Sequence, residues 1–289
     1  MKKRLAIALM IVLLAVTACA PQAAPTAAPT AVPPTTVPPT ETAVPPTATA
    51  APRTLTVFAA ASLTGAFGDI GKAFEAANPG VAVTFNFAGS QALRTQIEQG
   101  ATPDVFASAD HKNMDPLVQE NLVAAGGAKD FATNLLVVIL PPGNPANVQT
   151  LSDLTRAGLK IDLADSSVPV GNYARQVLTN MSKDPTYGAD YSDKVLANVV
   201  SNETDVKAVV SKVDLGEADA GIVYVTDAAA APGLKSIPIP ADYNVIAQYP
   251  IATLAASPNP DLASAFVDYV LSADGQAILN KWGFAPAGQ

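Results

Sequence analysis

The stretch LTVFAAASLT, residues 55–64, joins a predicted strand directly to a predicted helix. Its first half is apolar and partly β-branched, which is typical of a buried strand. Ser62 lies at the join. A helix that starts straight after a strand leaves backbone N–H groups and this hydroxyl available to an anion. From the join onward, apolar residues recur at helical spacing, at Leu63, Phe67, Ile70 and Phe74.

A second unit of the same kind follows. Residues 81–87 alternate between apolar and small or polar side chains, which indicates a strand, and a helix is predicted after Gly89 and Ser90. Ser90 therefore corresponds to Ser62. Serine is also a common helix cap, so each serine taken alone is better explained by a purely structural role.

Two more turns, in the second half of the chain, precede predicted helices that begin near Val170 and Val206. These two valines can offer only backbone N–H groups. Tyr224 lies at the carboxyl end of a further predicted strand, 220–224. We expect the four helix starts to face one another across a cleft and to hold one small oxyanion, because each carries about half a positive charge.

Strands alternate with helices along the chain, which predicts an α/β fold with largely parallel sheets. Two long apolar runs, 134–140 and 248–254, are interpreted as unbroken strands that form a paired hinge between two lobes. We expect the first lobe to comprise residues 53–136 plus 251–289, and the second lobe residues 137–250.

The N-terminal 52 residues differ from the rest. Residues 1–18 have a basic start and a short apolar run, and the motif VTAC that ends at Cys19 resembles the lipobox of bacterial lipoprotein signal peptides. We expect Cys19 to be lipidated. Residues 19–52 are rich in Pro, Thr and Ala and predict a disordered stalk. Because Cys19 is the only cysteine, no internal disulfide is expected.

The charge balance argues against nucleic acid as a partner. The chain has 17 Lys and Arg residues against 25 Asp and Glu residues, a net charge of −8, and removal of Lys2, Lys3 and Arg4 with the leader leaves 14 against 25, or −11. An anion held by such a protein must be held by local dipoles.

Four motifs together resemble the molybdate-binding proteins of ABC importers, namely VFAAASLT at 57–64, FAGS at 87–90, DVFASAD at 104–110 and GIVY at 221–224. The resemblance covers residues 54–286. It implies a two-lobed type II periplasmic-binding-protein fold, in which each lobe is a mostly parallel sheet flanked by helices and two hinge strands join the lobes. It also implies a monomer that delivers molybdate or tungstate to a membrane permease, from a lipid anchor on the outer face of the cytoplasmic membrane. No cofactor and no enzymatic activity are implied.

The resemblance also assigns the ligand contacts. Ser62 and Ser90 correspond to serines that donate hydroxyl and N–H bonds, Val170 and Val206 to backbone N–H donors, and Tyr224 to a hydroxyl donor. Two positions depart from the family pattern: Gly89 stands where Ser is frequent, and Val170 stands where Ala is frequent.

Every proposed contact is a donor, which favours a fully deprotonated oxyanion such as molybdate, tungstate or sulfate over hydrogen phosphate. Asp165 and Asp205 lie near the turns and are interpreted as solvated caps. A receptor for sulfate or another tetrahedral oxyanion is therefore the alternative within the binding class.

A serine hydrolase built on Ser62 and His111 is the alternative from a different class. His111 is the only histidine and lies in a polar run that predicts a surface position. No Gly-x-Ser-x-Gly motif is present. A single histidine is also too few for a site that binds Zn²⁺ or Mn²⁺ directly, so no catalytic residue and no cation ligand is predicted.

Overall fold

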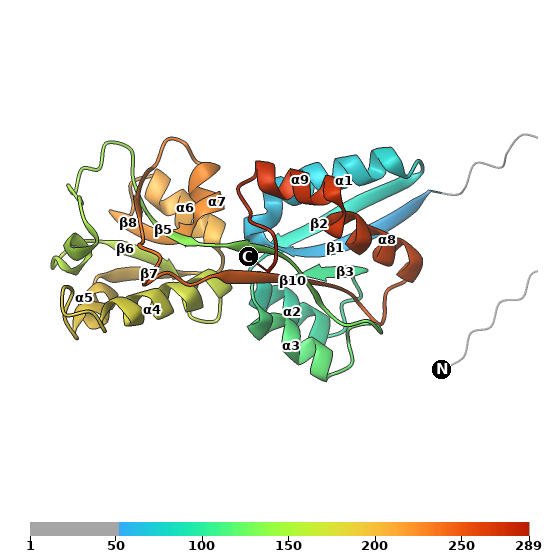
Figure 1. The fold of residues 1–289 in the computed structure, drawn as a ribbon, viewed down its shortest axis with the longest axis horizontal. Coiled ribbons are helices and arrows are strands. Elements are labelled where there is room, and N and C mark those ends of the chain that lie inside the picture. The colour runs from blue at the N-terminus through green and yellow to red at the C-terminus, as the bar shows by residue number, and fades with distance from the viewer. Residues whose placement is uncertain (1–51, 289) are drawn as a thin grey trace, which may run out of the picture. The chain divides into compact units, whose positions relative to one another are not determined.

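Two five-stranded sheets, flanked by helices, form two lobes in the computed structural model (Figure 1). The structure describes residues 52–288. The predicted signal peptide, Cys19 and the stalk as far as residue 51 lie outside the described residues. In the described chain, no helix is long and apolar enough to cross a membrane.

The first sheet has the strand order β2-β1-β3-β10-β4. Strands β2, β1 and β3 are parallel, and β10 runs antiparallel to both β3 and β4. Its strands are β1 (Arg53–Ala60), β2 (Val81–Ala88), β3 (Val105–Ala107), β4 (Lys129–Asn134) and β10 (Ala247–Thr253). Its helices are η1 (Ala61–Leu63), α1 (Thr64–Ala77), α2 (Ser90–Glu98), α3 (His111–Gln119), α8 (Pro260–Leu271) and α9 (Ala273–Lys281).

The second sheet has the order β7-β6-β8-β5-β9, and only β5 runs against the others. Its strands are β5 (Leu136–Leu140), β6 (Ile161–Ala164), β7 (Val199–Glu203), β8 (Ala220–Tyr224) and β9 (Lys235–Pro238). Its helices are η2 (Leu151–Thr155), α4 (Pro169–Met181), α5 (Tyr191–Ala197), α6 (Val206–Asp214) and α7 (Val225–Ala229).

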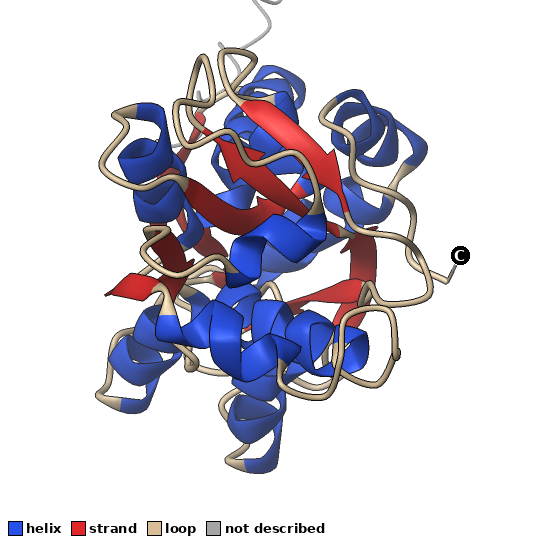
Figure 2. Ribbon diagram, turned by 90° about the vertical axis from the view of Figure 1, so that its left-hand side faces the viewer, coloured by secondary structure: helices blue, strands red, loops and turns tan. Residues whose placement is uncertain are grey.

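The predicted α/β fold with mostly parallel strands is confirmed, and the strands lie between helices (Figure 2). The helical face predicted for the first helix is buried, with Leu63, Phe67, Ile70 and Phe74 at most 2% exposed. Burial of these side chains against the first sheet holds the start of the helix at the edge where the strands end.

The chain crosses between the lobes beside Leu136 and again beside Asn244. The prediction of one unbroken strand over 134–140 was wrong, because β4 ends at Asn134 in the first sheet and β5 begins at Leu136 in the second. The second crossing leads into β10, so residues 247–250, which the sequence prediction placed in the second lobe, pair within the first sheet. The Asn244 side chain ties the two crossings together, since its Nδ2 donates to Leu136 O (2.8 Å) and its Oδ1 accepts from Leu136 N (3.0 Å).

Candidate functional site

One pocket lies where the strand-to-helix turns of both lobes meet. The structure brings all five sequence-predicted site residues to it, three from the second lobe and two from the first. The space between the lobes is narrow here, with a cavity volume of about 10 Å³. It is lined by Ala60, Ala61, Ser62, Ala88, Gly89, Ser90, Ala109, Val168, Pro169, Val170, Asp205, Val206 and Tyr224.

The two serines lie at the first-lobe turns. Ser90 begins α2 and is 1% exposed, and its Oγ accepts a hydrogen bond from the N–H of Ala109 (3.0 Å). That bond uses an acceptor position of the hydroxyl and leaves its proton for a ligand. Ser62 lies in η1, the 3₁₀ turn that leads into α1, and its Oγ is 3.2 Å from the hydroxyl of Tyr249.

Arg175 and Gly171 shape the turn that presents Val170. The Arg175 guanidinium donates to the carbonyl oxygens of Ala164 (2.9 Å) and Gly171 (2.8 Å), which ties the end of β6 to the start of α4. A Cβ at Gly171 would lie 2.1 Å from Asp165 O, so glycine is needed for this close approach. Val170 is second in α4, where a backbone N–H has no partner inside the helix.

Asp205 caps α6, the helix that begins at Val206. Its carboxylate accepts from the N–H groups of Lys207 (2.8 Å) and Ala208 (3.1 Å). The N–H of Val206, one residue earlier, does not donate to the Asp205 carboxylate. Asp205 therefore acts as a cap, as the sequence predicted, but it also lines the pocket. Asp165 is exposed and accepts from the N–H and hydroxyl of Ser167.

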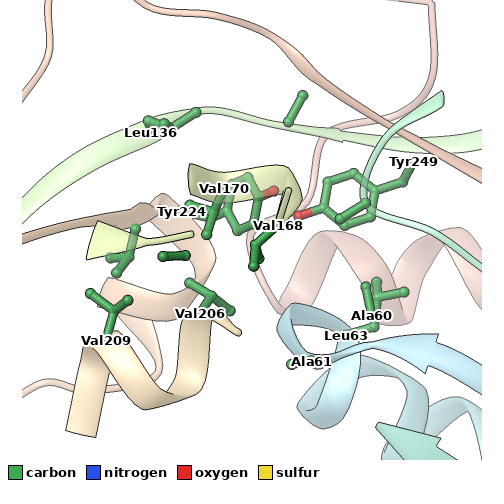
Figure 3. Close-up of a cluster of buried hydrophobic side chains, with 14 of the residues drawn as sticks. Ala60, Ala61, Leu63, Leu136, Val168, Val170, Val206, Val209, Tyr224 and Tyr249 are labelled. Carbon is green, nitrogen blue, oxygen red and sulfur yellow. The ribbon is translucent and has the colours of Figure 1, made fainter. Parts of the chain in front are cut away.

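Tyr224 ends β8 and is 1% exposed, and its hydroxyl has no hydrogen-bond partner within the described residues. Its ring meets that of Tyr249 edge to face at 5.8 Å, and the two hydroxyl ends point toward each other beside Val168 and Val170 (Figure 3). Burial raises the pKa of Tyr224 well above its ordinary value, helped by the neighbouring Tyr249. The phenol is therefore a permanent O–H donor without an acceptor.

No lysine or arginine lines the pocket. The cation nearest in sequence to the donor positions, Lys207, forms a 2.6 Å ion pair with Asp227, which is 1% exposed. Among residues 52–288, no group of three His, Cys, Asp or Glu side chains could hold a metal ion. The pocket thus presents backbone amides and hydroxyls, a donor set that suits an anion.

The hydrolase alternative receives no geometric support. The Ser62 hydroxyl contacts the hydroxyl of Tyr249. The two ring nitrogens of His111 are both engaged elsewhere, Nδ1 with Asp115 (3.1 Å) and Nε2 with Asp130 (2.7 Å). No hydrogen bond joins Ser62 to His111 in the described chain.

Sequence reasoning missed one contact beside the pocket. Gln91, the residue after Ser90, donates from Nε2 to the carbonyl oxygen of Thr204 in the opposite lobe (2.9 Å). Gly89 is next to this contact: a Cβ added at Gly89 would lie 2.4 Å from Thr204 O. The only sequence signal is the position of Gln91 within a predicted ligand turn.

Comparisons with known proteins agree with this geometry. The family model described as bacterial extracellular solute-binding protein matches residues 55–285. The molybdate-binding protein ModA of Mycobacterium tuberculosis (strain H37Rv) is 44% identical over 230 residues, which are 79% of this chain and 83% of that protein.

Two solved structures show the same fold. The periplasmic molybdate-binding protein of Azotobacter vinelandii has a TM-score of 0.69 at 23% identity, over 80% of this chain and 98% of that one. The sulfate-binding protein SubI of Mycobacterium tuberculosis has a TM-score of 0.72 at 18% identity, over 82% and 88%. These matches confirm the two-lobed periplasmic-binding-protein fold, and the chain belongs to the ModA family of bacterial extracellular solute-binding proteins.

Proposed function

We propose that this protein captures molybdate, and tungstate as its close analogue, in the pocket between the lobes and delivers it to the permease of an ABC importer. The observation that carries the proposal is the buried Tyr224 hydroxyl, which faces a pocket of donors and lacks an acceptor of its own. An oxyanion oxygen supplies that acceptor.

The proposed contacts are the hydroxyls of Ser62, Ser90 and Tyr224 and the backbone N–H groups at Val170 and Val206. Because these groups come from both lobes, a bound anion bridges the lobes and stabilises the closed arrangement. The absence of a lysine or arginine in the pocket lining fits a ligand held by helix starts, whose partial charges sum to about +2 over four helices.

The relatives support molybdate as the ligand, since the Mycobacterium tuberculosis protein at 44% identity is named for it. Sulfate is the second candidate, because the sulfate-binding protein SubI shares the fold. Molybdate is larger than sulfate, so a pocket shaped for one binds the other less tightly, and a comparison of the two Kd values distinguishes the candidates. Phosphate is disfavoured because the proton of hydrogen phosphate needs an acceptor, whereas all five proposed contacts are donors; Asp205, which also lines the pocket, caps α6 through its Oδ1.

We also infer an N-terminal lipid anchor at Cys19, a stalk over residues 19–52 and a monomeric state. The family is extracellular, and the lipobox-like motif before Cys19 supports the anchor. Radiolabelled palmitate incorporation into the wild type, and its loss in Cys19→Ala, tests it. The lobe boundaries proposed from the sequence are kept except at two places: Leu136 pairs within the second sheet, and residues 247–250 pair within the first.

The test of the ligand is a thermal-shift and calorimetric titration with molybdate, tungstate, sulfate and phosphate at pH 7. A ligand at 100 times its Kd adds about 2.7 kcal/mol of stability, which for a protein of this size raises the Tm by about 5–10 °C. We expect this shift with micromolar or lower molybdate and tungstate, a smaller one with sulfate, and none with phosphate. Equal binding of phosphate and molybdate contradicts the proposal.

A further inference from the structure

Tyr249 lies on β10, the strand by which the chain re-enters the first lobe, and its side chain is fully buried. Three aromatic rings meet it edge to face, Phe131 at 6.2 Å, Phe284 at 5.4 Å and Tyr224 at 5.8 Å. These contacts fix the ring on three sides. The direction of its hydroxyl is therefore set by the fold and not by the ligand.

The hydroxyl of Tyr249 lies 3.2 Å from Ser62 Oγ, and either oxygen can be the donor. A serine hydroxyl has one proton and two acceptor positions. When the Ser62 hydroxyl donates its hydrogen bond to a bound anion, its oxygen can only accept a hydrogen bond from Tyr249. The hydrogen bond then runs in one direction, from Tyr249 through Ser62 to the anion, and such chains strengthen one another.

Tyr249 also contacts the opposite side of the pocket, because its ring packs against that of Tyr224 (Figure 3). One side chain outside the pocket lining thus contacts a proposed ligand residue in each lobe. Burial raises the pKa of Tyr249 far above its ordinary value, which the neighbouring Ser62 and Asn134 side chains oppose, so the phenol remains a donor.

We propose that Tyr249 is a positioning residue for anion capture: it orients the Ser62 hydroxyl toward the ligand by donating to Ser62 Oγ. This inference rests on the proposed function. The competing interpretation is that Tyr249 is a packing residue whose buried hydroxyl takes Ser62 as a convenient partner. The two differ in whether the effect of Tyr249 on binding depends on Ser62.

A double-mutant cycle on the molybdate Kd separates them. Tyr249→Phe, which keeps the ring, is expected to raise the Kd about 3- to 10-fold by the loss of one hydrogen bond. In the Ser62→Ala background, Tyr249→Phe is expected to leave the Kd unchanged. Equal effects in both backgrounds, or no effect in either, overturn the proposal.

The matched control is Tyr191→Phe. Tyr191 is also buried, and its hydroxyl donates to the carbonyl oxygen of Leu151 (2.7 Å) within the second lobe. This variant loses one buried hydrogen bond of the same kind, so its Tm falls while its Kd stays that of the wild type. Tm values of all ligand-free variants show that each is folded. A wild type that binds none of the four anions overturns the proposed function as well, whereas additive effects on measurable binding overturn the role of Tyr249 alone.

Discussion

The Gln91 side chain of α2 donates a 2.9 Å hydrogen bond to the backbone carbonyl of Thr204, and this bond joins the first lobe to the second beside the pocket. Gly89, two residues earlier, has no Cβ, and one placed there would lie 2.4 Å from the same oxygen. The two lobes therefore approach each other at this point as closely as a glycine allows. The arrangement fits a cleft that closes over its ligand.

We expect Gly89→Ala to weaken molybdate binding about 5- to 150-fold, since overpacking of this kind costs about 1–3 kcal/mol. The added Cβ would lie 2.4 Å from Thr204 O in the opposite lobe and 2.4 Å from Gln91 Oε1 in its own lobe. The flexible Gln91 side chain can move aside, whereas the Thr204 backbone cannot, so the cost falls on the closed state. Gly89 has a φ of −59°, which alanine adopts without strain, so the Tm of the ligand-free protein should stay the same. Calorimetry and solution scattering measure the affinity and the closure; unchanged affinity would show that the lobes need not approach here.

Gln91→Ala tests the interlobe hydrogen bond itself. The bond forms only when the lobes are close, so its loss should raise the rate of molybdate release about 2- to 10-fold while the rate of association changes little. Stopped-flow displacement measures this release. Gln96→Ala is the control, because Gln96 lies on the same helix and accepts a hydrogen bond from Asn86 within the first lobe (3.1 Å); a similar acceleration in both variants would contradict the assignment.

Tyr224→Phe should act in opposite directions on stability and on binding. Without ligand, the buried Tyr224 hydroxyl lacks a partner in the described chain, so its removal should leave the Tm unchanged or raise it. With ligand, the variant lacks a donor to a charged acceptor worth about 1.5–3 kcal/mol, which raises the molybdate Kd about 10- to 150-fold. Thermal unfolding with and without molybdate measures both effects. A lower Tm without ligand and an unchanged Kd would mean that the hydroxyl is structural.

The strand-to-helix turns could be predicted because each is encoded within a dozen neighbouring residues. The apolar strand, the small turn and the helical spacing after Ser62 or Ser90 are all local. The position of Tyr224 at the end of a short apolar strand was also local, whereas its role as a donor was implied only by the family resemblance. The structure brings these residues to one pocket, a convergence that parallel strands impose on the turns at their carboxyl ends.

The features that the sequence did not predict depend on strand pairing and side-chain contacts between residues far apart in the chain. An apolar run such as 134–140 does not reveal that its strand partners change at Leu135, between one sheet and the next. The short elements β7, β9 and α5 were not predicted, since they are partly exposed or interrupted by polar residues. Tyr249 and Gln91 act through contacts 187 and 113 residues away, for which no local pattern exists.

Asp162, on β6, is a buried carboxyl group close enough to the partly buried Glu203 to feel its charge, and the sequence did not indicate it. Asp162 is fully buried, and neither of its carboxylate oxygens has a hydrogen-bond partner in the described chain. Burial, aided by the charge of Glu203, raises the pKa of Asp162 to about 7, while Lys212 opposes the shift. Lys212 forms a 2.6 Å ion pair with Glu203, so the cation is already engaged.

Because the folded protein holds the Asp162 proton to about pH 7 and the unfolded chain releases it near pH 4, this group stabilises the fold at low pH. Its contribution is complete below about pH 4 and is lost as the pH rises through about 7. Asp162→Asn keeps the shape and removes the titration. We therefore expect the free energy of unfolding of the variant, relative to wild type, to increase between pH 4 and 7 by at most about 4 kcal/mol, and to level off above pH 7. Urea denaturation across this range measures the difference, and a pH-independent difference would place the charged form of Asp162 in the folded protein throughout.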